Sequence, residues 1–230
     1  DWSDATKWTQ TAGDPVTLTP GEGPNGYIVI VNHNITLDKN YREGYRTTIS
    51  GTLSVVSPFY GHNLGTVTGS GKLYLESGSF PAGVFTSFLA CSNNATIEYG
   101  GSGTYTIIAD LYDNISNVIF SGTGTRVLPN KDLTICNLLR IDGPVLDNSV
   151  FNKKLTIQGS MTLVSGSFNS GSGAGATVTF AGAGLQSVGD DTDDYFRGSN
   201  AFNNLEINNS AGLRIGDDGA IEVKGNLLLT

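Results

Sequence analysis

The chain has 230 residues, of which 38% are hydrophobic and only 15% are charged, with 31 glycines and a formal net charge of −8. This composition is too apolar for a disordered chain, and its many Thr, Ser, Asn, Gly, Val and Ile residues favour strands and turns over helices. The sequence has neither a Lys/Arg cluster nor an apolar run of about 20 residues, so we expect no nucleic-acid partner and no membrane insertion.

Residues 1–26 come before the first strand-like segment and contain Trp2, Trp8 and a turn at Pro20–Gly21. Large aromatic side chains at a chain end can cover the exposed edge of a sheet, which otherwise invites aggregation. We therefore expect residues 1–26 to form a cap or lead-in segment. The chain begins without a methionine and ends within a strand-like pattern, which favours a segment of a longer protein.

From residue 27 onward the chain is a succession of short segments in which apolar and polar residues alternate. The segments are separated by Gly, Asn, Asp and Ser, and examples are YIVIVNHNITL (27–37) and AIEVKGNLLLT (220–230). No segment has sustained apolar residues at helical spacing, so we expect essentially no long helix. The pattern predicts an all-β chain of strand-sized units with turns between them.

The segment NYREGYR (40–46) interrupts this pattern and alternates aromatic with cationic side chains. Tyr41, Arg42, Tyr45 and Arg46 are therefore a candidate contact site for a sugar or a protein. The simpler interpretation, which we prefer, is a loop that packs over the edge of the fold.

Cys91 and Cys136 are too few for a disulfide framework, and the sequence leaves open whether they pair or remain thiols. The only histidines are His33 and His62. With so few cysteines and histidines, we predict neither a zinc site nor a histidine-based catalytic triad.

The phrase LYLESGSF (73–80) returns 88 positions later as MTLVSGSF (161–168). Other segments return in the same order, including ATIEYGGSGTYTI (95–107) as ATVTFAGAGLQSV (176–188) and DLTICNLL (132–139) as AIEVKGNL (220–227). This order predicts an internal duplication of about residues 66–141 and 154–230. Within each copy, strand-sized units recur about every 20 to 25 residues, which is typical of a stacked solenoid.

We therefore predict one domain over residues 1–230, a right-handed parallel β-helix of about ten short coils, on the order of 50 Å long. Stacked coils bury one alternating face of each strand. This predicts that Leu133 and Ile135 face the core and that Thr134 and Cys136 face solvent. The alternative fold is a pair of tandem β-sandwiches of about 90 residues each, since sandwich strands also alternate.

The insertion GDDTDD places four carboxylates, those of Asp190, Asp191, Asp193 and Asp194, within five positions. Calcium prefers clustered oxygen ligands, so these aspartates are a candidate calcium site. The alternative is a solvated acidic loop without an ion. Acids on the expected strands are isolated from one another, and no strand has paired acids beside a base, so we expect no catalytic site. No other cofactor is expected.

The succession of SGSF after a strand, ATVTFAGAGLQSV, FNNLEINNSAGLRI and VKGNLLLT resembles large secreted β-helix repeat proteins of Bacteroidota-type bacteria. The likeness covers residues 161–230 well and residues 66–141 more loosely. Trp2 and Trp8 before the Pro20–Gly21 turn are similar to the start of such modules.

The resemblance implies an extracellular or cell-surface module of an adhesin or stalk, of the kind exported by the type IX route. The partners it implies are neighbouring repeat modules of a longer chain and surface glycans or a host or other substratum. The alternative function is that of a carbohydrate-binding or polysaccharide-active β-helix protein.

Overall fold

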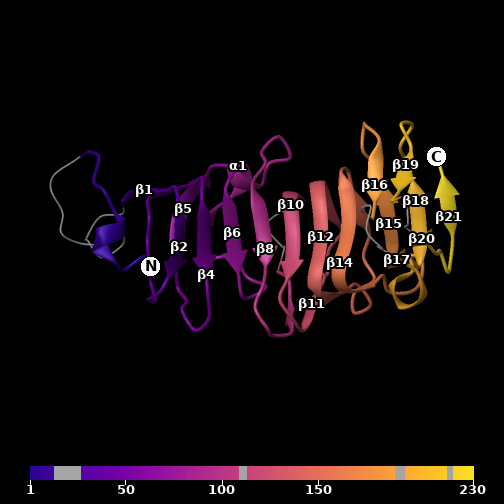
Figure 1. Ribbon diagram of the computed structural model, residues 1–230, viewed down its shortest axis with the longest axis horizontal. Coiled ribbons are helices and arrows are strands. Elements are labelled where there is room, and N and C mark those ends of the chain that lie inside the picture. The colour runs from indigo at the N-terminus through magenta and orange to yellow at the C-terminus, as the bar shows by residue number, and fades with distance from the viewer. Residues whose placement is uncertain (13–26, 109–112, 190–194, 217–219) are drawn as a thin grey trace.

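The computed structural model describes residues 1–12, 27–108, 113–189, 195–216 and 220–230. Its strands are parallel and stack as a β-solenoid of about nine turns with almost no helix. Figure 1 shows the strands side by side in a row that runs from the N-terminal to the C-terminal end. The predicted all-β solenoid is confirmed, and tandem sandwiches are not needed to explain the strand pairing.

In the N-terminal half each turn carries a first and a second strand joined by a short corner. The first strands pair with one another and so do the second strands, because successive turns stack in register. The first strands are β1 (Ile28–Val31), β3 (Arg46–Ile49), β5 (Asn63–Thr68) and β7 (Ala82–Val84), and the second are β2 (Asn34–Leu37), β4 (Thr52–Val55), β6 (Lys72–Leu75) and β8 (Thr96–Tyr99).

Toward the C-terminal half a third strand is added to each turn. β10 (Asn114–Ser121) and β12 (Leu133–Asp147) are long because they run through the corner between the first and second strand, which joins 15 strands into one sheet. First strands continue as β13 (Leu155–Ile157), β15 (Thr177–Phe180), β18 (Asn204–Ile207) and β21 (Leu227–Leu229), and second strands as β14 (Ser160–Asn169), β16 (Gln186–Val188) and β19 (Leu213–Ile215). Third strands are β9 (Tyr105–Thr106), β11 (Thr125–Val127), β17 (Tyr195–Phe196) and β20 (Ala220–Ile221), together with the ends of β12 and β14.

The helical elements are one turn each: η1 (Ala5–Lys7), α1 (Thr86–Leu89) and η2 (Gly198–Asn200). The described helices include none that is both long and apolar enough to cross a membrane. α1 follows β7 and buries Phe88 and Leu89 in the core. It therefore fills the interior where the pairing of first strands is interrupted between β7 and β10.

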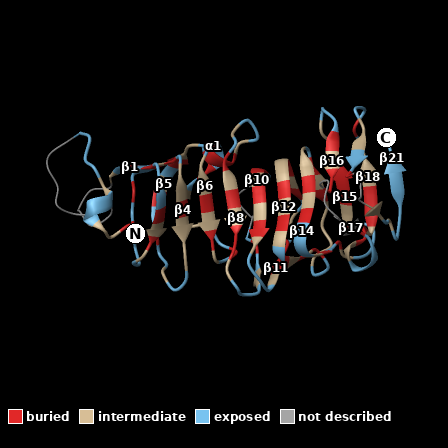
Figure 2. Cartoon of the chain, viewed as in Figure 1, coloured by how far each residue is buried: buried red, intermediate tan, exposed pale blue. Residues whose placement is uncertain are grey.

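A column of apolar side chains runs through the interior along the second strands. Figure 2 shows the corresponding buried bands recurring from strand to strand. The residues are paired in register through successive turns and are all buried: Ile35, Leu53, Leu73, Ile97, Val118, Leu139, Met161 and Val188. Each turn alone has no core, so the burial of this column is what makes the stack stable.

Glycines allow the second-to-third-strand corners to stack closely. Gly122 and Gly143 occupy this corner in successive turns with φ of 80° and 120°. A Cβ atom at Gly143 would lie 2.1 Å from the carbonyl oxygen of Gly122. Glycine suits this position because it adopts a positive φ readily and has no Cβ atom to clash with the carbonyl of the preceding turn.

Trp2 lies at the N-terminal end of the solenoid and is completely buried. Its backbone N–H donates to the carbonyl of Thr36 in the edge strand β2 at 2.7 Å. Trp8 packs edge-to-face on it with ring centroids 5.0 Å apart, and its Nε1 donates to the Trp2 carbonyl at 2.8 Å. The two indoles thus cover this end of the core, whereas Pro20–Gly21 lies outside the described residues.

Cys91 and Cys136 form a disulfide that joins the loop after α1 to β12, 45 residues further along the chain. Leu133 and Ile135 face the core as predicted, but the prediction that Cys136 faces solvent is wrong, because only 7% of it is exposed. β10 and β12 shift register at this point, between Ile115 and Asn117. The corner breaks the strict alternation of a strand, so a residue expected to face outward turns inward.

Candidate functional site: a tyrosine corner

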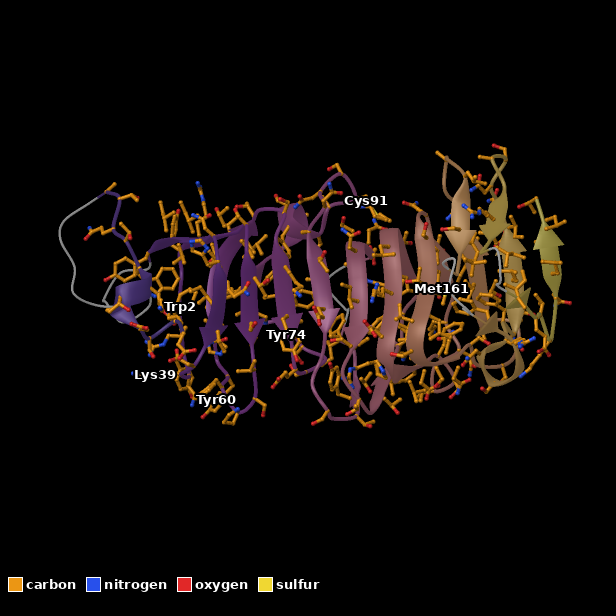
Figure 3. All side chains as sticks on the ribbon, viewed as in Figure 1. Trp2, Lys39, Tyr60, Tyr74, Cys91 and Met161 are labelled. Atoms are coloured by element: carbon orange, nitrogen blue, oxygen red, sulfur yellow. A yellow bond between two sulfur atoms is a disulfide. The ribbon has the colours of Figure 1, made fainter. Side chains whose placement is uncertain are left out.

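Two exposed tyrosines, Tyr41 and Tyr60, meet where successive turns leave their second strand. Tyr41 lies in the loop after β2, and Tyr60 lies in the loop after β4, which pairs with β2. Their side chains are 61% and 57% exposed. Figure 3 shows Tyr60 at the lower edge of the N-terminal half. We call Tyr41 and Tyr60, with Asn40 and Gly61, the tyrosine corner.

Hydrogen bonds hold the two rings of the tyrosine corner in a fixed relation. The N–H of Tyr41 donates to the carbonyl of Tyr60 at 2.9 Å, and the N–H of Tyr60 donates to Oδ1 of Asn40 at 3.0 Å. The ring centroids are 5.4 Å apart and the planes meet at 74°, an edge-to-face pair. The neighbouring Tyr60 side chain also raises the pKa of the Tyr41 phenol.

The backbone takes positive φ angles on both sides of this contact, 56° at Tyr41 and 74° at Gly61. A bulky residue such as tyrosine rarely adopts a positive φ. At Gly61 a Cβ atom would lie 2.5 Å from Cδ1 of the Tyr41 ring. The glycine therefore makes room for the ring, and the corner depends on the residue that follows Tyr60.

Arg42 and His62 are the neighbours of the corner in the chain, and both are buried, with 5% and 3% of their surface exposed. Nδ1 of His62 accepts the backbone N–H of Arg42 at 3.3 Å. Burial lowers the pKa of His62, and the charge of Arg42 lowers it further. His62 is therefore held neutral, and the Arg42 side chain is enclosed by the loop instead of lying on its surface.

The remaining residues predicted in this loop stay on the surface. Tyr45 is 69% exposed, and Arg46 is exposed at the start of β3, opposite Ile28 of β1. The structure thus pairs Tyr41 with Tyr60 and buries Arg42. That any of Tyr41, Arg42, Tyr45 or Arg46 contacts a ligand stays a prediction.

Sequence reasoning missed Tyr60. The signal that could have found it is the coil repeat, because Tyr41 and Tyr60 occupy equivalent loops of adjacent turns. Leu37 pairs with Val55 at the ends of β2 and β4, just before these loops, and this register brings the two tyrosines together.

The four aspartates of the predicted calcium site, Asp190, Asp191, Asp193 and Asp194, lie outside the described residues. Within the described part of the chain, no group of three or more His, Cys, Asp or Glu side chains could hold a metal ion. Calcium binding by the insertion therefore stays a prediction.

Charged side chains on the outer face of the solenoid pair between turns. Nζ of Lys72 in β6 lies 2.7 Å from Oε2 of Glu98 in β8. Nζ of Lys154 lies 3.0 Å from Oε2 of Glu206 in β18, which also accepts the Thr179 hydroxyl at 2.8 Å. The bond from Thr179, followed by that from Lys154, lowers the pKa of Glu206. Both carboxylates are thus bound to side chains of other turns.

The carboxyl groups with a shifted pKa in the described residues all have it lowered: Asp4, Asp38, Asp142 and Glu206. A general acid that works near neutral pH needs a raised pKa instead. The outer face is therefore chemically suited to joining turns, and its shifted carboxyl groups are poorly suited to donating protons.

Two hollows adjoin the solenoid. One, of about 400 Å³, lies beside the Lys154–Glu206 ion pair and is also lined by Asp132, Thr177 and Leu228. The other, of about 660 Å³, lies between residues 7–12 and β1. Its lining includes Ala12 and Tyr27, which flank in sequence a segment outside the described part of the chain, so we assign the hollow no role.

Comparison of the chain with family models, with curated proteins and with solved structures finds no match. The resemblance to secreted bacterial β-helix proteins therefore stays a prediction. Function is inferred below from the fold and from the described side chains.

Proposed function

We propose that this chain is a non-enzymatic structural and adhesive module, a segment of a large bacterial adhesin or stalk at the cell surface. The observation that carries the proposal is the buried column that continues from turn to turn along the second strands, from Ile35 to Val188. A stack held by such a column is a stiff rod, because bending it separates turns that share one core.

The outer face supports the same proposal. The ion pairs Lys72–Glu98 and Lys154–Glu206 join different turns. Exposed pairs of this kind contribute only about 0.2–1 kcal/mol each, so the core provides most of the stability and the pairs fix the register of the turns. Carboxylates held in this way favour a structural role over catalysis.

The disulfide between Cys91 and Cys136 supports an extracellular location. Structural disulfides persist in oxidising compartments and are rare in the cytosol. We propose the cell surface as the location. As partners we propose neighbouring repeat modules of the same polypeptide and glycans on the surface that the module contacts.

Two measurements test this proposal. Beads coated with the protein should be retained under flow on glycan-coated glass more strongly than beads coated with albumin. The protein should release no reducing ends and no unsaturated sugars from a panel of soluble polysaccharides. Release of such products would contradict the non-enzymatic assignment, and retention equal to that of albumin on every surface would contradict the adhesive one.

The second candidate is a carbohydrate-binding β-solenoid, and the tyrosine corner favours it. Aromatic side chains that stay exposed while most others are buried are a feature of recognition surfaces. A polysaccharide-degrading activity has weaker support, since the shifted carboxyl groups in the described residues have lowered pKa values.

A further inference from the structure

We infer that the tyrosine corner binds a neutral glycan and takes one or two of its pyranose rings against Tyr41 and Tyr60. This inference rests on the proposed adhesive function, for which the corner supplies the contact. It differs from that function in naming the site and the class of ligand.

The first step concerns exposure. The aromatic side chains of the interior, including Trp2, Phe85, Tyr99, Phe120 and Phe180, are almost completely buried. Tyr41 and Tyr60 instead leave more than half of their surface in water, at 61% and 57%. They gain little from folding, because burial of apolar area is what stabilises an aromatic side chain in a core. Their place in the fold is better explained by what they present to solvent.

The second step concerns order. The pair is held by the Tyr41 N–H on the Tyr60 carbonyl, by the Tyr60 N–H on Asn40 and by the edge-to-face contact of the two rings. The ring of Tyr41 also fills the space left by the missing side chain of Gly61. Rings that are fixed before binding lose little conformational entropy when a ligand arrives, so a small contact can give useful affinity.

The third step concerns chemistry. A pyranose ring has C–H groups on its faces and hydroxyls around its rim. Edge-to-face rings at 74° offer an apolar surface for such C–H groups, and the phenol oxygens beside it can hydrogen-bond to the rim. Asn40 accepts from Tyr60 through Oδ1, and its amide NH₂ group adds a donor type that suits hydroxyls. The exposed Lys39, the residue before Asn40, adds another.

The fourth step concerns size and charge. Two tyrosine rings cover far less than the roughly 1,200 Å² that a stable protein–protein interface buries, but they match one or two sugar rings. The net charge of −8 repels polyanions at long range. Both points favour a neutral glycan over a protein surface or an acidic polysaccharide.

Native affinity electrophoresis of the whole chain tests the inference. The probes are galactomannan, xylan and mixed-linkage β-glucan as neutral polysaccharides, with alginate as the acidic one. The variants are Tyr41→Ala and Tyr60→Ala, and Tyr45→Ala is the matched control, since Tyr45 lies in the same loop as Tyr41 and is also more than half exposed. Tyr60→Phe keeps the ring and removes only the hydroxyl.

At least one neutral polysaccharide should retard the unsubstituted protein. Tyr41→Ala and Tyr60→Ala should weaken its binding by about tenfold or more, whereas Tyr45→Ala should stay within about twofold. Tyr60→Phe should bind more tightly than Tyr60→Ala, and it keeps the test valid if either alanine variant fails to fold by circular dichroism.

Three results would overturn the inference: no retardation by any neutral polysaccharide, equal loss in Tyr45→Ala, or tighter binding to alginate than to the neutral polysaccharides. Those results would leave the proposed adhesive function intact if coated beads are still retained under flow. Conversely, depolymerisation of a probe would contradict the proposed function even if the retardation depends on the tyrosines.

Discussion

The guanidinium of Arg126 lies 4.5 Å from the centroid of the Tyr105 ring and is completely buried. Its Nη2 donates to the carbonyls of Gly100, Gly101 and Ser121, each at 2.8 Å. The corner between the second and third strands brings these carbonyls together from adjacent turns, where the Gly101 carbonyl also accepts the N–H of Thr123 and the Gly100 carbonyl also accepts the hydroxyl of Tyr105. A buried cation satisfies them at once, and charge-assisted bonds of this kind are stronger than neutral ones.

Replacing this cation should be among the most damaging single changes in the chain. Arg126→Met keeps much of the apolar length but removes every hydrogen bond that the guanidinium donates to the corner carbonyls, and we expect a loss of at least about 3 kcal/mol in the free energy of unfolding. Arg140→Ala is the control, because Arg140 pairs with Asp142 at the surface and should cost about 1 kcal/mol or less. Urea unfolding followed by circular dichroism measures both. An equal loss in the two variants would contradict the assigned role of Arg126.

The burial of Arg126 could not be predicted from the sequence. Alternation along a strand is enough to predict that Leu133 and Ile135 face inward, because apolar residues and turns carry that pattern locally. Arg126 pairs in register with the buried Leu146 at an inward position. No local pattern marks this charged residue as buried, since most of the carbonyls that hold it, those of Tyr99, Gly100, Gly101 and Gly103, come from the preceding turn.

The candidate site was predictable only in part for the same reason. Tyr41 stands out within NYREGYR, but its partner Tyr60 is one turn away and becomes a neighbour only through the register of β2 and β4. The burial of Arg42 could not be predicted either, because it depends on the loop of the next turn, which brings His62 against it.

Tyr99 carries a buried polar group that, unlike the guanidinium of Arg126, has no hydrogen-bond partner in the described structure. This group is its hydroxyl, which lies in the core, and burial raises the pKa of the phenol. Tyr99→Phe removes an unsatisfied group and nearly nothing else. We therefore expect the free energy of unfolding to stay unchanged or to rise by up to about 1 kcal/mol.

Tyr105→Phe is the matched control for Tyr99→Phe. The Tyr105 hydroxyl donates to the carbonyl of Gly100 at 2.8 Å, and its removal should cost about 0.5–1.5 kcal/mol. Burial raises the pKa of Tyr105 to about 12, so both tyrosines are neutral in urea titrations at pH 7. A larger loss in Tyr99→Phe than in Tyr105→Phe would show that the Tyr99 hydroxyl has a partner.

His62 should make the stability depend on pH in mildly acidic solution. Its pKa is lowered in the folded chain by burial and by Arg42, so the unfolded chain binds the proton more readily. Stability is then fully present above the unfolded pKa of about 6.5 and falls as the pH drops below that value toward the folded pKa. The melting temperature should therefore decrease as the pH is lowered from about 7.5 to about 5.5.

His62→Gln separates this effect from the titration of carboxyl groups. Glutamine offers an oxygen to the backbone N–H of Arg42, as Nδ1 of His62 does, but it does not bind a proton in this range. The variant should have a melting temperature that changes less over the same pH interval. Curves of equal slope for the two proteins would rule out His62 as the source.

The disulfide should contribute measurably to stability because it closes a loop of 45 residues. Cross-links of this length typically stabilise by about 2–4 kcal/mol, mainly by restricting the unfolded chain.

A double variant, Cys91→Ser with Cys136→Ser, should melt at a lower temperature than the oxidised protein, and a reducing agent should not change its melting temperature. Reduction of the unsubstituted protein should lower its melting temperature toward that of the double variant. Scanning calorimetry with and without reductant gives both values, and thiol titration of the denatured, unreduced protein should find no free thiol. Two free thiols per chain, or equal melting temperatures, would show that the cysteines do not pair, and would remove the main support for an oxidising compartment.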